Sequence, residues 1–145
     1  MKLAVDTNIV LSAMITPRGA VGELLLFTWP RLELFAPEHL RVELSKHREK
    51  AAKAARLTVD EIVEIEGIVL SRITTMPHAV LPATIWERAF HLVKDIDEDD
   101  AQFVALALHL NCPLWTGDKK LLTPLRRKRF ELLITSEELR RKLGA

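Results

Sequence analysis

The stretch Leu3-Ala4-Val5-Asp6-Thr7-Asn8 decides the fold, because it is an apolar strand that ends directly at an acidic residue. A similar arrangement occurs near the other end of the chain, at Leu114-Trp115-Thr116-Gly117-Asp118. Parallel strands bring their carboxyl ends to one edge of a sheet, so residues far apart in sequence meet there. We therefore expect Asp6 and Asp118 to lie close together, at an edge that suits a metal ion.

An acidic cluster lies between these two junctions, at Asp95-Ile96-Asp97-Glu98-Asp99-Asp100. It precedes a helical pattern that runs from Ala101 to Leu108. Acidic residues in the first turn of a helix face the positive end of its dipole, so helix capping explains one or two of them. The cluster contains more acids than capping requires, and it is a candidate part of the same site.

The composition indicates one ordinary globular domain that spans residues 1–145, with 48% hydrophobic and 28% charged residues. No apolar run reaches the roughly 18 residues that a membrane span needs. Because the chain starts directly with a strand, we expect no signal peptide and a cytoplasmic location. The single cysteine, Cys112, cannot form an internal disulfide, and no Cys/His spacing resembles a zinc site. Oxygen ligands then favour Mg²⁺ or Mn²⁺.

The charge is unevenly distributed, although the net charge is only +1. Residues 1–118 contain 12 basic and 17 acidic side chains, a net charge of −5. Residues 119–145 contain 9 basic and 3 acidic side chains, a net charge of +6. This basic tail is suited to attract phosphate, but basic runs are equally common as solvated surface or as charges at helix carboxyl ends.

The order of elements indicates an α/β protein. Apolar runs predict strands at residues 3–5, 32–36, 78–81, 113–116 and 130–134. Helical patterns predict helices at residues 9–14, 19–27, 37–55, 58–73, 82–93, 101–110 and 120–127, and a closing helix capped by Ser136. Strands that alternate with helices, without hairpin turn signals, predict a three-layer α/β/α sandwich with a mainly parallel central sheet of about five strands.

Each candidate acid also has a simpler structural interpretation. Asp6 and Asp118 could each cap the helix that follows its strand. Their polar neighbours Thr7, Asn8 and Thr116 could instead hold the carboxylates in orientation around a metal ion. Glu43, in the helix after the second strand, would by itself be an exposed glutamate, and only the wider pattern makes it a candidate.

The chain resembles PIN-domain nucleases, including the toxins of VapBC-like toxin–antitoxin pairs. The resemblance lies in Val5-Asp6-Thr7-Asn8, in Val42-Glu43-Leu44, in Asp97-Glu98-Asp99-Asp100-Ala101-Gln102-Phe103 and in Trp115-Thr116-Gly117-Asp118. It covers nearly the whole chain, with the motifs in the expected order. The motif around Asp6 and the motif around Asp118 are each moderately specific, and together with the Asp-Asp-Ala helix start they form a strong signature.

The resemblance implies an acidic quartet of Asp6, Glu43, Asp100 and Asp118 that binds one or two Mg²⁺ or Mn²⁺ ions. Asp6 and Asp100 would be direct ligands, whereas Asp118 would place a second ion or the attacking water, and Glu43 would do likewise or act as a general base. Asp97 and Asp99 would cap or orient rather than ligate.

The implied activity is endoribonuclease cleavage of RNA by metal-activated water, as the toxin of a type II toxin–antitoxin system. The implied partners are an RNA substrate, a second copy of the chain in a homodimer, and a small antitoxin that covers the acidic groove. No membrane is involved in this interpretation.

Two other functions remain open from the sequence. One is a PIN-like module without catalytic activity that binds RNA or protein, and an intact quartet argues against it. The other is a phosphotransfer domain with acids at its strand ends. A haloacid-dehalogenase-like phosphatase would need a second aspartate where Asn8 stands, and the acid pair and strand-end lysine of a receiver domain fit poorly.

The remaining chemically active side chains favour structural roles. The five histidines show no HxxxH or HExxH grouping, so surface or half-buried positions are expected. We expect Trp29, Trp86 and Trp115 in the core or at an interface rather than as platforms for base stacking. Cys112 is expected to be a packed thiol.

Overall fold

The computed structural model describes residues 1–28 and 31–144, and its centre is a five-stranded sheet. All of its strand pairs are parallel, and the strand order is β3-β2-β1-β4-β5. The strands are β1 (Lys2–Val5), β2 (Glu33–Pro37), β3 (Ile73–Met76), β4 (Leu114–Trp115) and β5 (Leu133–Ile134). The predicted sheet is confirmed, and it is fully parallel rather than mainly so.

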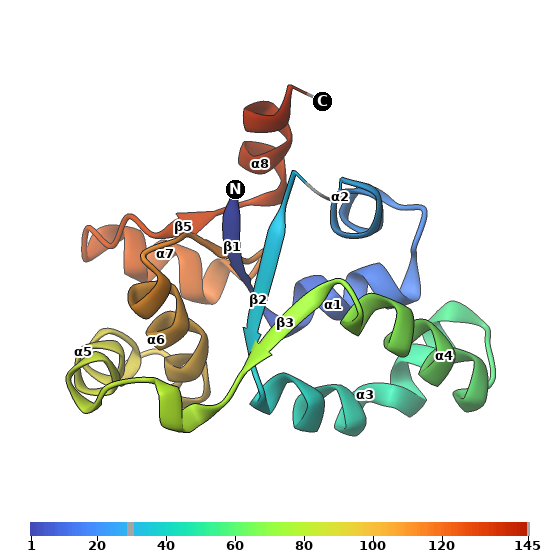
Figure 1. Cartoon of the computed structure of the whole chain (residues 1–145), viewed down its shortest axis with the longest axis horizontal. Coiled ribbons are helices and arrows are strands. Elements are labelled where there is room, and N and C mark those ends of the chain that lie inside the picture. The colour runs from blue at the N-terminus through green and yellow to red at the C-terminus, as the bar shows by residue number, and fades with distance from the viewer. Residues whose placement is uncertain (29–30, 145) are drawn as a thin grey trace.

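Helices connect all of these strands. They are α1 (Thr7–Ile15), α2 (Ala20–Phe27), α3 (His39–Ala55), α4 (Val59–Leu70), α5 (Ala83–Val93), α6 (Ala101–Leu110), α7 (Lys119–Arg127) and α8 (Ser136–Leu143), with short 3₁₀ helices η1 (His78–Val80) and η2 (Glu98–Asp100). In Figure 1, helices α1 to α4 lie on one side of the sheet and helices α5 to α7 on the other. The three-layer α/β/α architecture is therefore confirmed.

Two hydrophobic clusters form the core, one on each face of the sheet. Leu3 and Val5 of β1 pack into the cluster with α1 to α4 and α8, whereas Ala4 packs into the cluster with α5, α6 and α7. Because successive side chains of a strand point to opposite faces, a strand covered on both faces is apolar throughout. The uninterrupted run Leu3-Ala4-Val5, buried at every position, is the sequence signature of this central strand.

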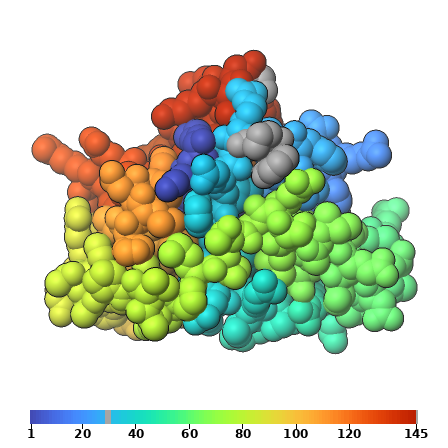
Figure 2. All heavy atoms as spheres, in the orientation of Figure 1, coloured from blue at the N-terminus to red at the C-terminus, as the bar shows by residue number. Residues whose placement is uncertain are grey.

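The arrangement of layers leaves the carboxyl edge of the sheet between the start of α3 and the start of α6. Strands β1, β2 and β3 all point toward this edge, which faces the bottom of the view in Figure 1. In the same orientation, Figure 2 shows the segments of α3 and α4 filling one side of the molecule and α5 filling the other. The residues that follow β1 and β4 therefore lie between the two helical layers.

One predicted strand was wrong. The sequence favoured a third strand at residues 78–81, but η1 occupies residues 78–80 and the true third strand is Ile73–Met76. Ile73 continues the apolar spacing of α4, yet that helix ends at Leu70, and the β-branched run Ile73-Thr74-Thr75 pairs with β2. The prolines at positions 77 and 82 confine the intervening residues to a short turn.

Several predicted helix ends also shift. Pro37 is the last residue of β2 rather than the first of α3, which begins at His39. Thr135, not Ser136, caps α8, because its hydroxyl accepts the backbone N–H of Glu138 in a capping box. Thr58 and Glu61 form a capping box at the start of α4, and Asn111, with φ of 50°, ends α6 in the left-handed conformation.

No single helix among the described residues is long and apolar enough to cross a membrane. The helices α1 and α2 would meet that length and composition only as a pair, across a bend of 101°.

Candidate metal centre

Asp6 lies where β1 ends and α1 begins. Its backbone N–H donates to the carbonyl of Trp115 at 3.1 Å, which fixes β1 beside β4. The carboxylate forms no capping hydrogen bond with α1, and the residue is only 6% exposed. Instead, the Thr116 hydroxyl donates to Oδ2 of Asp6 at 2.7 Å. Capping therefore does not explain this acid, because its side chain is held from the neighbouring strand.

Thr116 joins the two strand-end acids. It is fully buried directly after β4, and its Oγ1 accepts the backbone N–H of Asp118 at 3.1 Å while donating to Asp6. Asp118 itself accepts the backbone N–H of Lys120 at 3.0 Å, so this acid does cap α7. The simpler interpretation thus holds for Asp118 and fails for Asp6, and both side chains lie at the same edge.

Glu43 belongs to α3, whose first turns face this edge. Its side chain is 24% exposed, and Oε1 lies 3.6 Å from Nε2 of His39, one turn earlier on the helix. From sequence, His39 was expected, like the other histidines, only at a surface or half-buried position. The i, i+4 spacing of His39 and Glu43 was the signal that could have linked them.

The acidic cluster divides into capping and site residues. Asp97 caps η2, since its Oδ1 accepts the backbone N–H of Asp99 at 3.0 Å. Asp99 is exposed. Asp100 is half-buried at the junction of η2 and α6, and its side chain forms no capping hydrogen bond. Of these three acids, Asp100 is the one that the fold turns toward the other carboxylates.

The negative charges of neighbouring acids act on two of the four carboxylates, those of Asp6 and Asp100. Burial raises the pKa of Asp6, the Thr116 hydroxyl and the adjacent backbone N–H of Thr7 lower it, and the charges of Asp118 and Glu43 raise it again. Burial and then the negative charges of Asp6, Asp97, Asp118 and Glu43 raise the pKa of Asp100 to about 7. Without a cation, the fold therefore favours a proton on Asp100 near neutral pH.

The chemistry of these donors fits Mg²⁺ or Mn²⁺, because carboxylate oxygen is the ligand type that hard divalent cations prefer. A cation among the carboxylates would remove the repulsion that raises the pKa of Asp100. As the described residues stand, however, no group of three His, Cys, Asp or Glu side chains is arranged to hold a metal ion.

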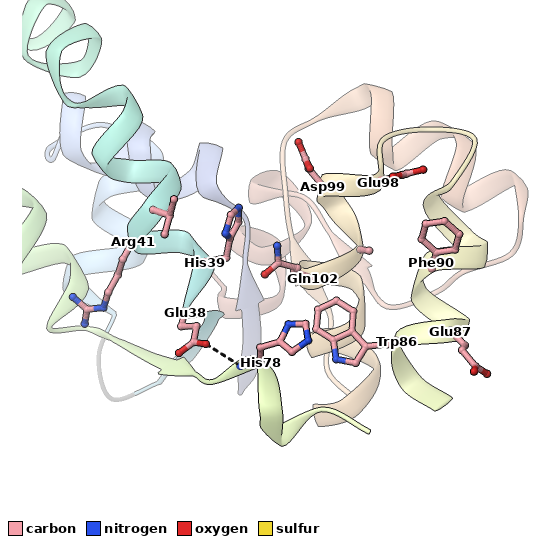
Figure 3. A pocket seen from close by; sticks show the side chains of 12 residues that line it. Glu38, His39, Arg41, His78, Trp86, Glu87, Phe90, Glu98, Asp99 and Gln102 are labelled. Atoms are coloured by element: carbon pink, nitrogen blue, oxygen red, sulfur yellow. Dashed lines mark hydrogen bonds between the residues drawn. The ribbon is translucent and has the colours of Figure 1, made fainter. Parts of the chain in front are cut away.

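A groove of about 1050 Å³ opens beside this centre, between the start of α3 and the helices α5 and α6. We call it the α3/α5 groove (Figure 3). Its lining includes His78 and Trp86, whose rings stack with centroids 4.3 Å apart. Its remaining polar or charged lining residues are Glu38, His39, Arg41, Glu87, Glu98, Asp99 and Gln102. Acids predominate among these charges, so the rim is negative.

The other predicted residues take varied positions. Thr7 is buried at the start of α1, and its hydroxyl has no hydrogen-bond partner among the described residues, whereas Asn8 is exposed. Trp115 is fully buried, as predicted, and Cys112 is also buried. Trp86 is half-buried and lines the α3/α5 groove, and Trp29 lies outside the described residues.

Comparison with known proteins shows the family. The family model of the PIN domain matches residues 4–134. The chain belongs to the PIN domain family.

A solved structure has the same fold. It is the crystal structure of VapBC2 from Rickettsia felis bound to a DNA fragment from their promoter, of which one chain matches with a TM-score of 0.65 and 18% sequence identity. The match covers 93% of this chain and 97% of that chain. No curated protein sequence matches this chain significantly.

Proposed function

We propose that this protein is a metal-dependent endoribonuclease that hydrolyses RNA phosphodiester bonds. The observation that supports the proposal most strongly is the meeting of two acids at the ends of parallel strands, where the Thr116 hydroxyl donates to the buried Asp6 carboxylate at 2.7 Å and accepts the backbone N–H of Asp118. Burial and four neighbouring carboxylates also raise the pKa of Asp100 to about 7. Buried carboxylates that repel one another lower the stability of the fold, so a purely structural role does not explain them. Groups with strongly shifted pKa values are concentrated at functional sites. Membership of the PIN domain family makes a nuclease the natural use of such a centre.

In this proposal, Asp6 and Asp100 hold Mg²⁺ or Mn²⁺ directly, and Asp118 and Glu43 help to place a second ion or the water. When bound, the ion supplies polarisation of the phosphate, a lower pKa of the attacking water and neutralisation of charge on the leaving oxygen. Thr116 keeps the Asp6 carboxylate oriented and hydrogen-bonded. In the same proposal, Glu43, a partly exposed carboxylate on α3, accepts a proton from the attacking water.

The likeness to a chain of the VapBC2 structure supports a more specific role, the toxin of a type II toxin–antitoxin pair. A small antitoxin would then cover the acidic edge and place a basic side chain among the carboxylates. Co-purification with the product of a neighbouring short reading frame would test this role. A homodimer, the single-domain organisation of residues 1–145 and a cytoplasmic location remain predictions.

The test of the activity is cleavage of a labelled mixed-sequence RNA by purified protein, with Mg²⁺, with Mn²⁺ and with chelator. Asp6→Asn is the decisive variant, and Asp60→Asn is its matched control, because Asp60 is an exposed aspartate in the first turn of α4. Metal-dependent cleavage that is lost in Asp6→Asn and kept in Asp60→Asn supports the proposal. A folded wild-type protein that binds RNA and does not cut it with either ion favours the alternative of a binding module.

A further inference from the structure

A second groove, of about 430 Å³, lies on the other side of Glu43, between α1 and α3. We call it the α1/α3 groove. One wall is formed by the face of α1 that contains Asn8 and Ser12, and the other by the face of α3 that contains His47, Lys50 and Ala54. These residues recur every three or four positions on their helices, so each set forms one continuous helical face.

The α1/α3 groove begins within about one helical turn of the candidate metal centre on both of its helices. Asn8 lies two residues after Asp6, in the first turn of α1, and His47 lies one turn after Glu43 on α3. A chain that leaves the centre between the two helices would therefore meet Asn8 and His47 first. Lys50 lies seven residues beyond Glu43, which is about 10 Å along the helix axis.

The charges of the α1/α3 groove differ from those of the acidic edge. No carboxylate lines it, and its polar groups are an amide, hydroxyls, an imidazole and the ammonium of Lys50. His47 and Lys50 are exposed, and neither forms an ion pair within the part of the chain that the structure describes. The α3/α5 groove, in contrast, is lined by four carboxylates that would repel a phosphate backbone.

We infer that an RNA strand leaves the metal centre through the α1/α3 groove, where Lys50 binds a phosphate that flanks the scissile one. This inference rests on the proposed ribonuclease function. Because Lys50 is offset from Glu43 by about 10 Å along α3, we assign its ammonium to the backbone of a neighbouring nucleotide rather than to the scissile phosphate. Asn8 and Ser12 offer hydrogen-bond donors from the opposite wall.

The experiment compares Lys50→Gln with Lys53→Gln on two substrates. Lys53 is the matched control because it is an exposed lysine on the same helix, three residues on, and does not line the groove. The substrates are an RNA of about eight nucleotides and a dinucleotide whose only phosphate is the scissile one. Both are assayed with Mg²⁺ or Mn²⁺, and binding of the longer RNA is measured by fluorescence anisotropy in chelator over a range of salt.

For the longer RNA, Lys50→Gln should raise KM about fivefold, leave kcat nearly unchanged and reduce the salt slope of binding by about 1. It should leave cleavage of the dinucleotide unchanged, and Lys53→Gln should leave both substrates unchanged. Equal effects of the two variants, or an equal loss on the dinucleotide, would overturn the inference. Unchanged RNA kinetics in Lys50→Gln would also overturn it and leave the groove to a protein partner.

Failure of the proposed function gives a different result. A wild-type protein that cleaves neither substrate contradicts the proposed nuclease activity. The anisotropy measurement then decides by itself whether RNA binds in the α1/α3 groove. Weaker binding of Lys50→Gln than of Lys53→Gln supports the RNA path even in that case. Equal binding by the two variants, or no RNA binding by any form, overturns it.

Discussion

The candidate metal centre has residues that follow strands, which we call the strand side, and residues that belong to helices or helix starts, which we call the helix side, and the two sets are held differently. The strand side consists of Asp6, Thr116 and Asp118, which hydrogen bonds join to one another and to the backbone of two strands. The helix side consists of Glu43 and Asp100. No hydrogen bond among the described residues reaches the Asp100 side chain, and the nearest partner of Glu43 is His39 at 3.6 Å.

This difference indicates that folding alone forms one part of the site and that a cation would complete the other part. Parallel strand pairing fixes the strand side as soon as the sheet forms, because the Asp6 backbone bonds directly to β4. The helix side remains under repulsion, with the pKa of Asp100 at about 7. We therefore expect the strand side to be formed without the ion. We expect the helix side to be completed only when a divalent cation binds.

The largest expected effect is on catalysis, where both sides should be equally necessary. Asp6→Asn and Asp100→Asn each remove a proposed direct ligand, and each should lower kcat/KM on RNA by roughly 10³-fold or more. Initial rates with saturating Mg²⁺ or Mn²⁺ measure the effect, with Asp60→Asn as the control. If Asp100→Asn retains a tenth of the activity, Asp100 is not a necessary metal ligand.

The second effect is on stability, and here the strand side and the helix side should behave differently. At a free Mg²⁺ concentration of about 100 times its Kd, binding should stabilise the wild-type protein by about 2.7 kcal/mol, seen as a rise in Tm. Asp100→Asn should lose this increment, and without the ion it should be more stable than the wild type because repulsion is relieved. Thermal unfolding with chelator and with Mg²⁺ measures both.

An Mg²⁺ increment that is the same in the wild type and in Asp100→Asn would contradict this scheme. It would mean that the ion binds elsewhere, and Asp60→Asn shows the size of a nonspecific charge effect.

The strand side was also the more predictable one from sequence. The apolar run Leu3-Ala4-Val5 ends at an acid, and parallel sheets place such ends together, so the neighbourhood of Asp6 and Asp118 followed from strand pairing alone. Thr116 could be named as an orienting residue for the same reason. Its double role, donating to Asp6 and accepting from Asp118, required atomic positions.

The helix side and its surroundings depend on packing that no local pattern encodes. Glu43 looked like any exposed helix glutamate, and its position at the edge results from how α3 packs across α1. The third strand was misplaced because Ile73 fits the apolar spacing of α4, and only pairing with β2 distinguishes the two possibilities. The aromatic pair of His78 and Trp86 joins η1 to α5, and nothing in the sequence links those positions.

A smaller effect should follow from loosening the strand side. Thr116→Val removes the donor to Asp6 and should lower metal affinity about 10- to 100-fold, because the buried carboxylate loses its orientation. Thr116→Ser restores a hydroxyl and should recover most of the affinity. Calorimetric titration with Mn²⁺ measures the change. If the Thr116→Val and Thr116→Ser proteins bind Mn²⁺ with equal affinity, the Thr116 hydroxyl does not orient Asp6.

The smallest expected effect is a pH dependence of stability in the metal-free protein, and it belongs to the helix side. Asp100 has a pKa of about 7 in the folded state against an ordinary value of 3.8, so the folded state binds the extra proton between these values. The free energy of unfolding should therefore fall as pH rises through this window, by about 1–2 kcal/mol after allowance for solvent screening of a half-buried group.

Urea unfolding in chelator at pH 4.5 to 7.5 measures this slope. Asp100→Asn should flatten it, and it should do so more than Asp6→Asn, because the hydrogen bonds from Thr116 and Thr7 oppose the rise in the pKa of Asp6. Mg²⁺ should remove the fall in stability with rising pH in the wild type, since an ion among the carboxylates favours the ionised form of Asp100. Parallel curves of unfolding free energy against pH for wild type and Asp100→Asn in chelator would contradict a raised pKa of Asp100.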